Sequence, residues 1–281
     1  MDSLVLQAPA KINWRLCITG RRPNGYHELD MIMQTISLHD TLSLHPSNHN
    51  DLFVNGAPEE SPEKNLIIKA AKALSSFVDK SICARFELVK RIPSMAGLGG
   101  GSSDCAQALL GLNRMYDLGL STENLHGIAL SLGADVPFFL YGGLCRVQGI
   151  GEKVQQLPFA PKAPIVLCHV QPGLSTPAMY SQFDRVAYSG EEGSTDAFIT
   201  KLKSGDYCGL EAFNALEAPA IELLPPIKET AKALTTCGAA FTLMSGSGSA
   251  VYGVFGDASA AQAALDCIPG SLLAYTSAAL A

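Results

Sequence analysis

The sequence has few charged residues and no run of basic ones. Charged residues make up 16% of the 281, and 20 Lys and Arg against 26 Asp and Glu give a net charge of -6. A nucleic-acid partner requires clustered basic side chains to neutralise phosphates, so we expect none here. The 47% of hydrophobic residues is instead typical of a globular chain with enough apolar side chains for a core.

Disulfide, signal and membrane patterns are missing as well. The eight cysteines are scattered and form no C-x-x-C pair, so we expect reduced thiols rather than a disulfide framework. The opening residues Met1–Leu4 contain neither a basic nor an apolar segment, and the uncharged stretch 233–256 is rich in Gly and Ser at its centre. We therefore expect no signal peptide, no membrane partner and a cytoplasmic protein.

Hydrophobic spacing predicts strands and helices in a mixed order. Strands are predicted over residues 4–6, 12–16, 26–44, 84–89, 165–170, 241–244, 250–255 and 272–275. Helices are predicted after residue 103 and over 121–132, 176–183, 195–202, 227–236 and 258–267. Another helix is expected to begin at Ser61-Pro62, with an inner face formed by Leu66, Ala70, Leu74 and Phe77. This order predicts an α+β fold with two domains, 1–155 and 156–281, joined in the Gly- and Pro-rich segment 149–164.

The glycine-rich stretch from Pro93 to Ser103 is the strongest chemical signal. Glycines allow positive φ and omit the Cβ atoms that would keep a phosphate away. A loop that enters a helix also offers free backbone N–H groups at the positive end of the helix dipole. Ser102 and Ser103 can add hydroxyl contacts or reach a Mg²⁺ ion. The stretch fits a phosphate site, and it also fits a flexible loop followed by a helix cap.

The common nucleotide-binding motifs are absent. The sequence contains no G-x-x-x-x-G-K-[ST] and no G-x-G-x-x-G after a strand, and it lacks the H-R-D and D-F-G segments of protein kinases. A nucleotide bound by the glycine-rich stretch would therefore lie in a different fold.

Three segments together resemble the motifs of the GHMP kinases, a family that includes galactokinase, homoserine kinase, mevalonate kinase and phosphomevalonate kinase. They are Ala8–Asn13, Pro93–Ser103 and Met244–Ser249, in the family's order and spacing. The resemblance implies a kinase that phosphorylates a small-molecule alcohol with ATP and Mg²⁺. It also implies an N-terminal domain like domain 2 of ribosomal protein S5, with the phosphate loop and the catalytic residues, and a ferredoxin-like C-terminal domain with the second glycine motif.

Two further segments, Gly20–Leu29 and Gly133–Phe139, resemble one branch of this family. That branch acts on a small cytidine diphosphate substrate in isoprenoid precursor synthesis. The sequence departs from the family where Ser247-Gly248-Ser249 replaces Thr-Gly-Ala, and no acidic residue is marked as a Mg²⁺ ligand. Two alternatives stay open: another GHMP small-molecule kinase of the homoserine or mevalonate-pathway type, or a nucleotide-binding regulator that has lost catalysis.

Lys11 and Asp135 are the candidate catalytic pair. A kinase that acts on an alcohol benefits from a carboxylate beside the hydroxyl and a cation that keeps this carboxylate ionised. Asp135 lies in an apolar neighbourhood, where a carboxylate is costly unless it has a partner or a task. Taken alone, Asp135 also fits a turn residue bonded to the backbone, and Lys11 a strand lysine that reaches solvent. The resemblance implies the catalytic roles.

The remaining site residues follow from the resemblance. The implied nucleotide contacts are Asn65, near the adenine, and the loop residues Pro93, Ala96, Gly97, Leu98, Gly99, Gly100, Gly101, Ser102 and Ser103. The implied substrate contacts are Asn13, near the acceptor hydroxyl, with Gly246, Ser247 and Gly248. Tyr26 and Tyr180 are implied to sandwich the cytosine while His27 recognises its edge. By residue type alone, these three aromatic residues also fit ordinary packing.

Overall fold

A computed structural model describes residues 2–186, 193–207 and 209–277, and its chain divides into two compact units. Unit 1 comprises Met1–Ala10, Leu38–Ile92 and Gly99–Tyr141, and unit 2 comprises Lys11–Ser37, Pro93–Leu98 and Gly142–Ala281. The units are interleaved along the chain, whereas we expected the consecutive halves 1–155 and 156–281. Two long strands, β1 (Leu4–Arg21) and β2 (His27–Pro46), run through both units.

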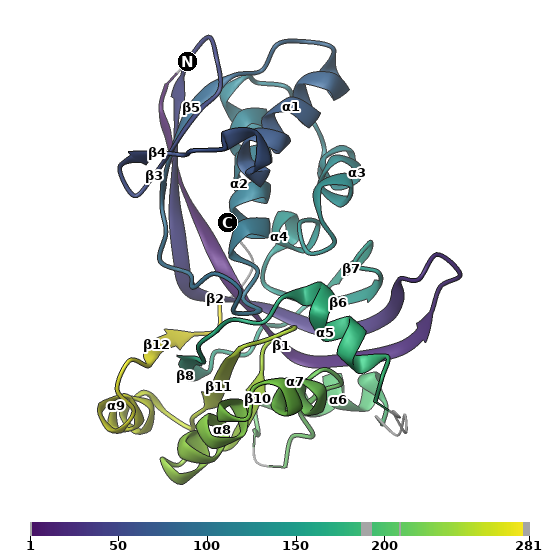
Figure 1. Cartoon of the computed structure of the whole chain (residues 1–281), viewed down its shortest axis with the longest axis vertical. Helices are drawn as coiled ribbons and strands as arrows, with labels where there is room; N and C mark the ends of the chain where they lie inside the picture. The colour runs from purple at the N-terminus through teal and green to yellow at the C-terminus, as the bar shows by residue number, and fades with distance from the viewer. Residues whose placement is uncertain (1, 187–192, 208, 278–281) are drawn as a thin grey trace. The chain divides into compact units, whose positions relative to one another are not determined.

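Unit 1 is a sheet with helices on one face (Figure 1). Its further elements are β3 (Asp51–Val54), β4 (Ala57–Pro58), α1 (Leu66–Val78), β5 (Ala84–Val89), α2 (Gly100–Met115), α3 (Thr122–Leu132) and the short α4 (Phe138–Tyr141). Strand β5 pairs antiparallel with β2, from Thr41 opposite Val89 onward, and parallel with β3. Helix α2 lies close to the sheet, because a Cβ at Gly111 would come within 2.7 Å of Leu6 and 2.8 Å of Leu44.

The predicted start of the first helix is wrong by four residues. Pro62–Lys64 forms a single 3₁₀ turn and Ser61 makes no capping bond, whereas Asn65 is extended and its side chain accepts from the N–H of Ile67. Asn65 is therefore the N-cap of α1. The predicted inner face is wrong at Phe77, which is 51% exposed in the last turn of the helix. The residues that α1 buries are Ile67, Ile68, Ala70, Ala71 and Leu74.

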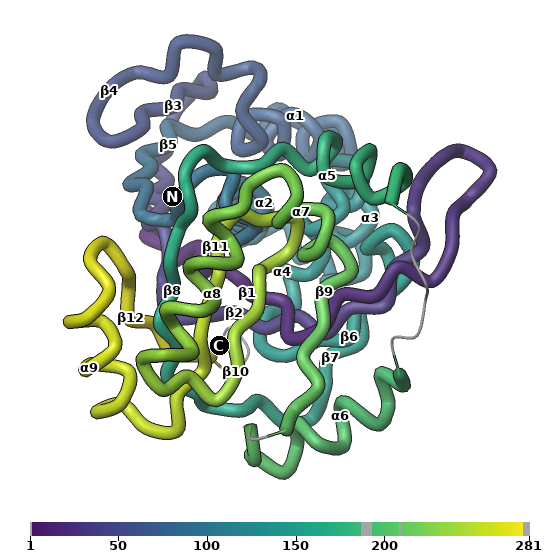
Figure 2. Tube along the Cα trace, turned by 60° about the horizontal axis from the view of Figure 1, so that its bottom comes forward, coloured from purple at the N-terminus to yellow at the C-terminus, as the bar shows by residue number. Residues whose placement is uncertain are grey.

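Unit 2 contains a four-stranded antiparallel sheet in the order β10-β11-β8-β12, which Figure 2 traces with α8 and α9 beside it. Its strands are β8 (Pro164–His169), β10 (Phe241–Met244), β11 (Ala250–Val254) and β12 (Leu272–Tyr275). Its helices are α5 (Thr176–Phe183), α6 (Thr195–Lys203), α7 (Glu217–Leu223), α8 (Pro226–Thr236) and α9 (Ala258–Cys267). Gly253 lets α8 approach the sheet, because a Cβ there would lie 3.3 Å from Leu234.

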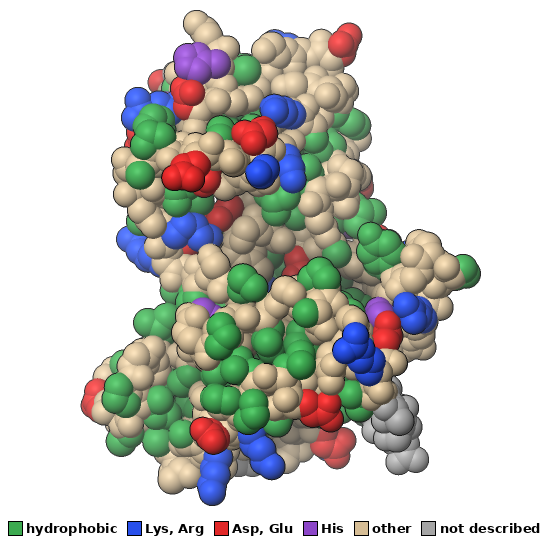
Figure 3. Space-filling model, in the orientation of Figure 1, with side chains coloured by type: hydrophobic (Ala, Val, Ile, Leu, Met, Phe, Trp, Pro, Cys, Tyr) green, Lys and Arg blue, Asp and Glu red, His purple; other side chains and the backbone are tan. Residues whose placement is uncertain are grey.

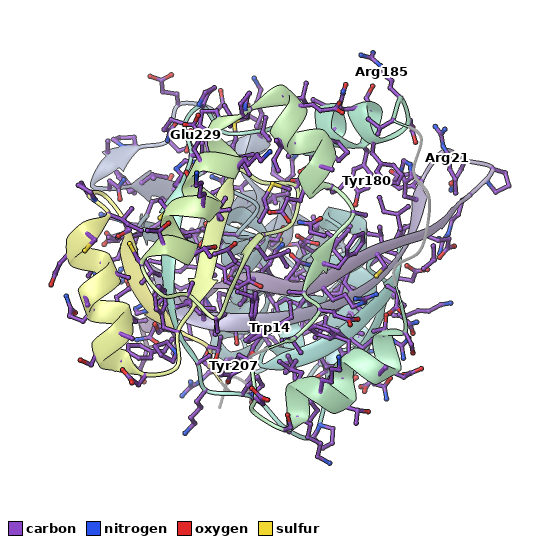
Figure 4. The ribbon with its side chains drawn as sticks, turned by 90° about the horizontal axis from the view of Figure 1, so that it is seen from below. Trp14, Arg21, Tyr180, Arg185, Tyr207 and Glu229 are labelled. Atoms are coloured by element: carbon purple, nitrogen blue, oxygen red, sulfur yellow. The ribbon has the colours of Figure 1, made fainter. Side chains whose placement is uncertain are left out.

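Parts of β1 and β2 complete unit 2 together with β6 (Leu144–Gly149), β7 (Lys153–Gln156) and β9 (Phe213–Asn214). Trp14 of β1 is fully buried in this unit and stacks on Tyr207, with ring centroids 5.8 Å apart (Figure 4). Strand and helix are thus mixed without strict alternation, and the predicted α+β class is confirmed.

Two expectations from composition concern the whole chain. Each cysteine in the described part of the chain is a free thiol, and Cys208 lies outside the described residues. Within the same described ranges, no helix combines the length and the apolar character needed to cross a membrane.

Candidate active site

The glycine-rich stretch leads into α2 without a side-chain cap. Gly97 and Gly99 both have φ of +72°, a conformation that favours glycine. Gly99 is the N-cap of α2 and has no side chain to bond the first amides of the helix. The backbone N–H groups at this N-terminus are therefore available to an anion such as a phosphate. Pro93–Leu98 belong to unit 2 and Gly99–Ser103 to unit 1.

The second glycine motif lies against the first one within unit 2. The Ser245 hydroxyl donates to the Gly97 carbonyl at 3.1 Å, and the N–H of Ala250 donates to the Ala96 carbonyl at 3.1 Å. A Cβ at Gly97 would come within 2.0 Å of the Ser245 carbonyl oxygen. Glycine at position 97 is thus required by the close approach of two backbone segments, as well as by its positive φ.

Lys11 lies beside both glycine motifs. Its side chain is buried, its N–H donates to the Leu98 carbonyl at 3.0 Å, and its Nζ donates to Asn13 Oδ1 at 2.6 Å. A Cβ at Gly246 would lie 2.7 Å from Lys11 Nζ, so Gly246 leaves room for the ammonium group. The structure therefore brings together Lys11, Asn13, Gly97 and Gly246, four of the predicted site residues.

Asp135 is half-buried in the turn between α3 and α4, in unit 1. Its side chain makes no hydrogen bond or ion pair with any residue in the described ranges, and it does not bond to the backbone near Gly133. That leaves the carboxylate without the capping role that the sequence alone allowed. Because Lys11 belongs to unit 2, the pairing of Lys11 with Asp135 stays a prediction.

A buried charge cluster beside the phosphate loop escaped the sequence analysis. Asp40 is fully buried in β2, accepts from the N–H groups of Arg91 and Ile92 at 2.5 and 2.9 Å, and forms an ion pair with Lys90. Lys90 also bonds Asp104 in the first turns of α2 at 2.9 Å. The Asp40–Lys90–Asp104 cluster thus connects the chain before the loop, at Ile92, with the helix after it.

Electrostatics in this cluster follow from burial. Desolvation raises the pKa of Asp104 to about 7, although the Lys90 ammonium opposes the shift. Two carboxylates share one lysine, so the cluster favours uptake of a proton at Asp104. Ser103 Oγ and Asp104 Oδ1 are both buried, and neither has a hydrogen-bond partner among the residues that the structure describes. Unpartnered buried oxygens are uncommon in native proteins, and these two lie at the helix end where the loop would hold a phosphate.

Two of the three aromatic residues predicted to bind the cytosine, His27 and Tyr180, contact each other within unit 2. The His27 ring stacks on Tyr180, with centroids 4.8 Å apart and planes 20° apart, and its Nε2 lies 2.8 Å from Asp184 Oδ1. Tyr26 is 59% exposed. Figure 4 shows Tyr180 of α5 beside the end of β1 that carries Arg21, whose guanidinium lies 3.3 Å from Asp184. Figure 3 shows basic and acidic side chains close together at the right, where Figure 1 shows the end of β1 and the start of β2.

Asn214 is a further site residue that the sequence analysis did not predict. Its amide donates to the carbonyls of Met244 and Gly246, both at 2.8 Å, and so holds the second glycine motif in place. Ser247 in that motif shares a hydrogen bond of 2.9 Å with Thr176. Nothing in the spacing around Asn214 indicated this role, because its partners lie 30 and 32 residues further along the chain.

Comparison with known proteins identifies the family. The model described as "GHMP kinases N terminal domain" matches residues 65–143, and that described as "GHMP kinases C terminal" matches residues 200–272. The 4-diphosphocytidyl-2-C-methyl-D-erythritol kinase of Geobacter metallireducens is 39% identical over 273 residues, 96% of each chain. The chain belongs to the GHMP kinases. It is therefore a small-molecule kinase, and ATP is the phosphoryl donor of this family.

Other members support the same placement in the GHMP kinases. The Pelobacter propionicus protein of the same name is 37% identical over 266 residues, 94% of each chain. The crystal structure of a 4-(cytidine 5'-diphospho)-2C-methyl-D-erythritol kinase matches with a TM-score of 0.82 at 33% identity, over 97% of this chain and 99% of that one. A homoserine kinase from Cytophaga hutchinsonii has a TM-score of 0.76 at 18% identity, over 99% and 96%, and so shows the shared fold alone.

Proposed function

We propose that this GHMP kinase transfers the γ-phosphoryl group of ATP to the 2-hydroxyl of 4-diphosphocytidyl-2-C-methyl-D-erythritol, in the non-mevalonate route to isoprenoid precursors. The observation that carries the proposal is the contact of the two glycine motifs around the buried Lys11 ammonium. Relatives of this name, 37% and 39% identical over nearly the whole chain, support the choice of substrate.

The chain's own residues would act chiefly by position and charge. The amides of the loop and of the α2 N-terminus would bind the ATP phosphates. Lys11, held by Asn13, would place a positive charge at the acceptor oxygen. Asp135, which has no hydrogen bond within the described residues, would orient the hydroxyl and accept its proton. Asn65 would lie near the adenine, as the resemblance implies.

Mg²⁺ fits this arrangement as a cation held largely by the nucleotide. Mg²⁺ usually takes one or two protein oxygens and several phosphate or water oxygens. Over the described ranges, no three His, Cys, Asp or Glu side chains gather closely enough to hold a metal by themselves. Ser103 Oγ, which is buried and has no hydrogen-bond partner in the described part of the chain, is an oxygen that could serve as one ligand. The ion would neutralise charge on the phosphates.

The test is turnover of ATP by the purified chain with three acceptors: the diphosphocytidyl substrate, homoserine and mevalonate. We expect ADP release with the first alone. Release with homoserine or mevalonate instead would support another branch of the family. No release with any acceptor, together with ATP binding by calorimetry, would support a regulator that has lost catalysis.

The catalytic assignment has its own test. Asp135→Asn and Lys11→Ala should each lower kcat by roughly 10²–10⁴-fold, the usual contribution of a positioned acid or base. The double variant should lose much less than the product of the two losses, because groups that act together are non-additive. Asp117→Asn, at an exposed position after α2, is the matched control. A folded Asp135→Asn enzyme with near-native kcat would contradict the assignment.

A further inference from the structure

The Asp184 carboxylate contacts the side chains of both Arg21 and His27. Asp184 is the C-cap of α5, and its backbone N–H already bonds the Tyr180 carbonyl. One carboxylate oxygen lies 2.8 Å from His27 Nε2 and the other 3.3 Å from the Arg21 guanidinium. The His27 side chain is 9% exposed and that of Asp184 30%, so the contact lies at the edge of the unit. Asp184 and His27 are 157 residues apart in the chain.

The imidazole of His27 is held in one orientation by its neighbours. Tyr180 covers one face, and the Phe183 ring meets His27 edge-on with centroids 5.8 Å apart. Among the described residues, the imidazole of His27 forms its hydrogen bond through Nε2, to Asp184. Turning the ring over would keep it stacked on Tyr180 but would break the contact of Nε2 with Asp184. The Nδ1 atom is therefore the one that the protein leaves for another partner.

An ionised carboxylate can only accept hydrogen bonds, so the Nε2 atom that faces Asp184 must carry the proton. In a neutral imidazole the other nitrogen, Nδ1, is then an acceptor. The other oxygen of the Asp184 carboxylate pairs with the Arg21 guanidinium at 3.3 Å, so each oxygen of the carboxylate has one partner. Asp184 thus determines which hydrogen-bonding group His27 offers to a ligand.

We propose that Asp184 is a positioning residue that fixes the His27 tautomer, so that Nδ1 accepts from the exocyclic amine of cytosine and rejects uracil. Uracil carries a carbonyl oxygen where cytosine carries the amine, and two acceptors cannot form a hydrogen bond. This inference rests on the proposed cytidyl substrate. It adds a residue that touches no substrate atom and yet determines the choice of base.

The experiment measures kcat/KM for 4-diphosphocytidyl-2-C-methyl-D-erythritol and for its uridine analogue. In the native enzyme the cytidine compound should be strongly preferred. In Asp184→Asn the side-chain amide can either donate to or accept from Nε2, so both tautomers of His27 become available. We expect the preference to fall at least tenfold, chiefly through a higher KM for the cytidine compound, while kcat changes little. Asp184→Glu, which keeps the carboxylate, should recover part of the preference.

The matched control is Asp196→Asn. Asp196 also pairs with an arginine, Arg146, at 2.8 Å on the surface of unit 2, and no histidine in the described ranges contacts it. We expect its preference for cytidine to equal that of the native enzyme. A folded, active Asp184→Asn enzyme with an unchanged preference would overturn the proposal, and so would an equal loss in the Asp196→Asn control.

Nitrogen-15 spectra of the histidine rings test the tautomer without turnover. The native protein should show an unprotonated Nδ1 in His27, and Asp184→Asn a mixture of tautomers. A protonated Nδ1 in the native protein would overturn the inference. If the native enzyme turns over neither nucleotide, the proposed function fails. Calorimetric binding of CDP and UDP to the same variants then decides the inference, and equal preference for CDP in native and Asp184→Asn proteins would reject it.

Discussion

Two clusters in this kinase use a carboxylate to hold a cation, and they differ in what surrounds them. In unit 1, Asp40 is fully buried and its two oxygens together accept two backbone N–H groups and the Lys90 ammonium. In unit 2, the Asp184 carboxylate is partly exposed, and its partners among the described residues are two side chains, those of His27 and Arg21. The first arrangement fixes a backbone segment, and the second orients a ring that keeps one atom for a ligand. Burial and bonds to the backbone thus distinguish Asp40, which anchors a segment of the chain, from Asp184, which orients a side chain for recognition of a ligand.

The largest effect should come from removing the buried anchor. Asp40→Ala leaves the Lys90 cation with Asp104 alone and strands the N–H groups of Arg91 and Ile92. Breaking a buried pair on one side costs about 3–5 kcal/mol. Urea unfolding should show a loss of that size in the free energy of unfolding. A loss below about 1 kcal/mol would mean that water reaches the site and that Asp40 does not anchor the loop.

The next largest loss of stability should come from a substitution at Gly97, compared with the same substitution at Gly101. Gly97→Ala puts a Cβ 2.0 Å from the Ser245 carbonyl at a φ of +72°, so one backbone segment must move. Overpacking of this kind costs about 1–3 kcal/mol. Gly101→Ala is the control, since Gly101 is helical and no described atom beyond its own helix backbone and chain neighbours lies within 4 Å of a Cβ built there. We expect Gly101→Ala to leave the unfolding free energy within about 1 kcal/mol of the native value. Equal losses in the two variants would contradict the close approach.

The sequence alone predicted those elements correctly whose defining residues lie close together in the chain. Strands β5, β10 and β12 and helices α5 and α9 match their predicted bounds, because local spacing and caps such as Asp257 define them. The hairpin of β6 and β7 was missed, since its glycines read as a boundary. The two strands predicted near the start are one strand, β1, which runs without a break from Leu4 to Arg21 beside β2.

The same limit applies to the site. Glycine, lysine and serine in short motifs were enough to predict the phosphate loop and its neighbour. The two carboxylate clusters could not be predicted, because Asp40 is 50 residues from Lys90 and Asp184 is 157 from His27. An acidic residue in a strand or at a helix end has many ordinary explanations, and only the folded chain shows which cation it meets.

A pH experiment on Asp104 separates charge from packing in the buried cluster. Its pKa is raised to about 7 by burial, so between about pH 4 and 7 the folded state binds more protons here than the unfolded state. This group therefore lowers stability as the pH rises through that range. Asp104→Asn removes the titration. Urea unfolding at about pH 5 and about pH 8 gives the free energy of unfolding of both proteins. The value for Asp104→Asn minus the value for the native protein should be more positive at the higher pH, because only the native protein loses stability through this group. A constant difference would mean that Lys90 keeps Asp104 ionised throughout.

The smallest effect on stability should come from the partly exposed cluster. Asp184→Ala removes one exposed ion pair and one hydrogen bond to a ring that stays stacked on Tyr180. Exposed ion pairs are worth about 0–1 kcal/mol and weaken with salt. The unfolding free energy should fall by no more than about that amount, and by less in about 1 M salt, whereas the preference for cytidine over uridine should drop sharply. A loss near that of Asp40→Ala would make Asp184 a structural anchor, and a change in base preference would then follow from disturbed packing rather than from the tautomer of His27. Small stability loss with a large loss of preference is the combination that only the recognition role predicts.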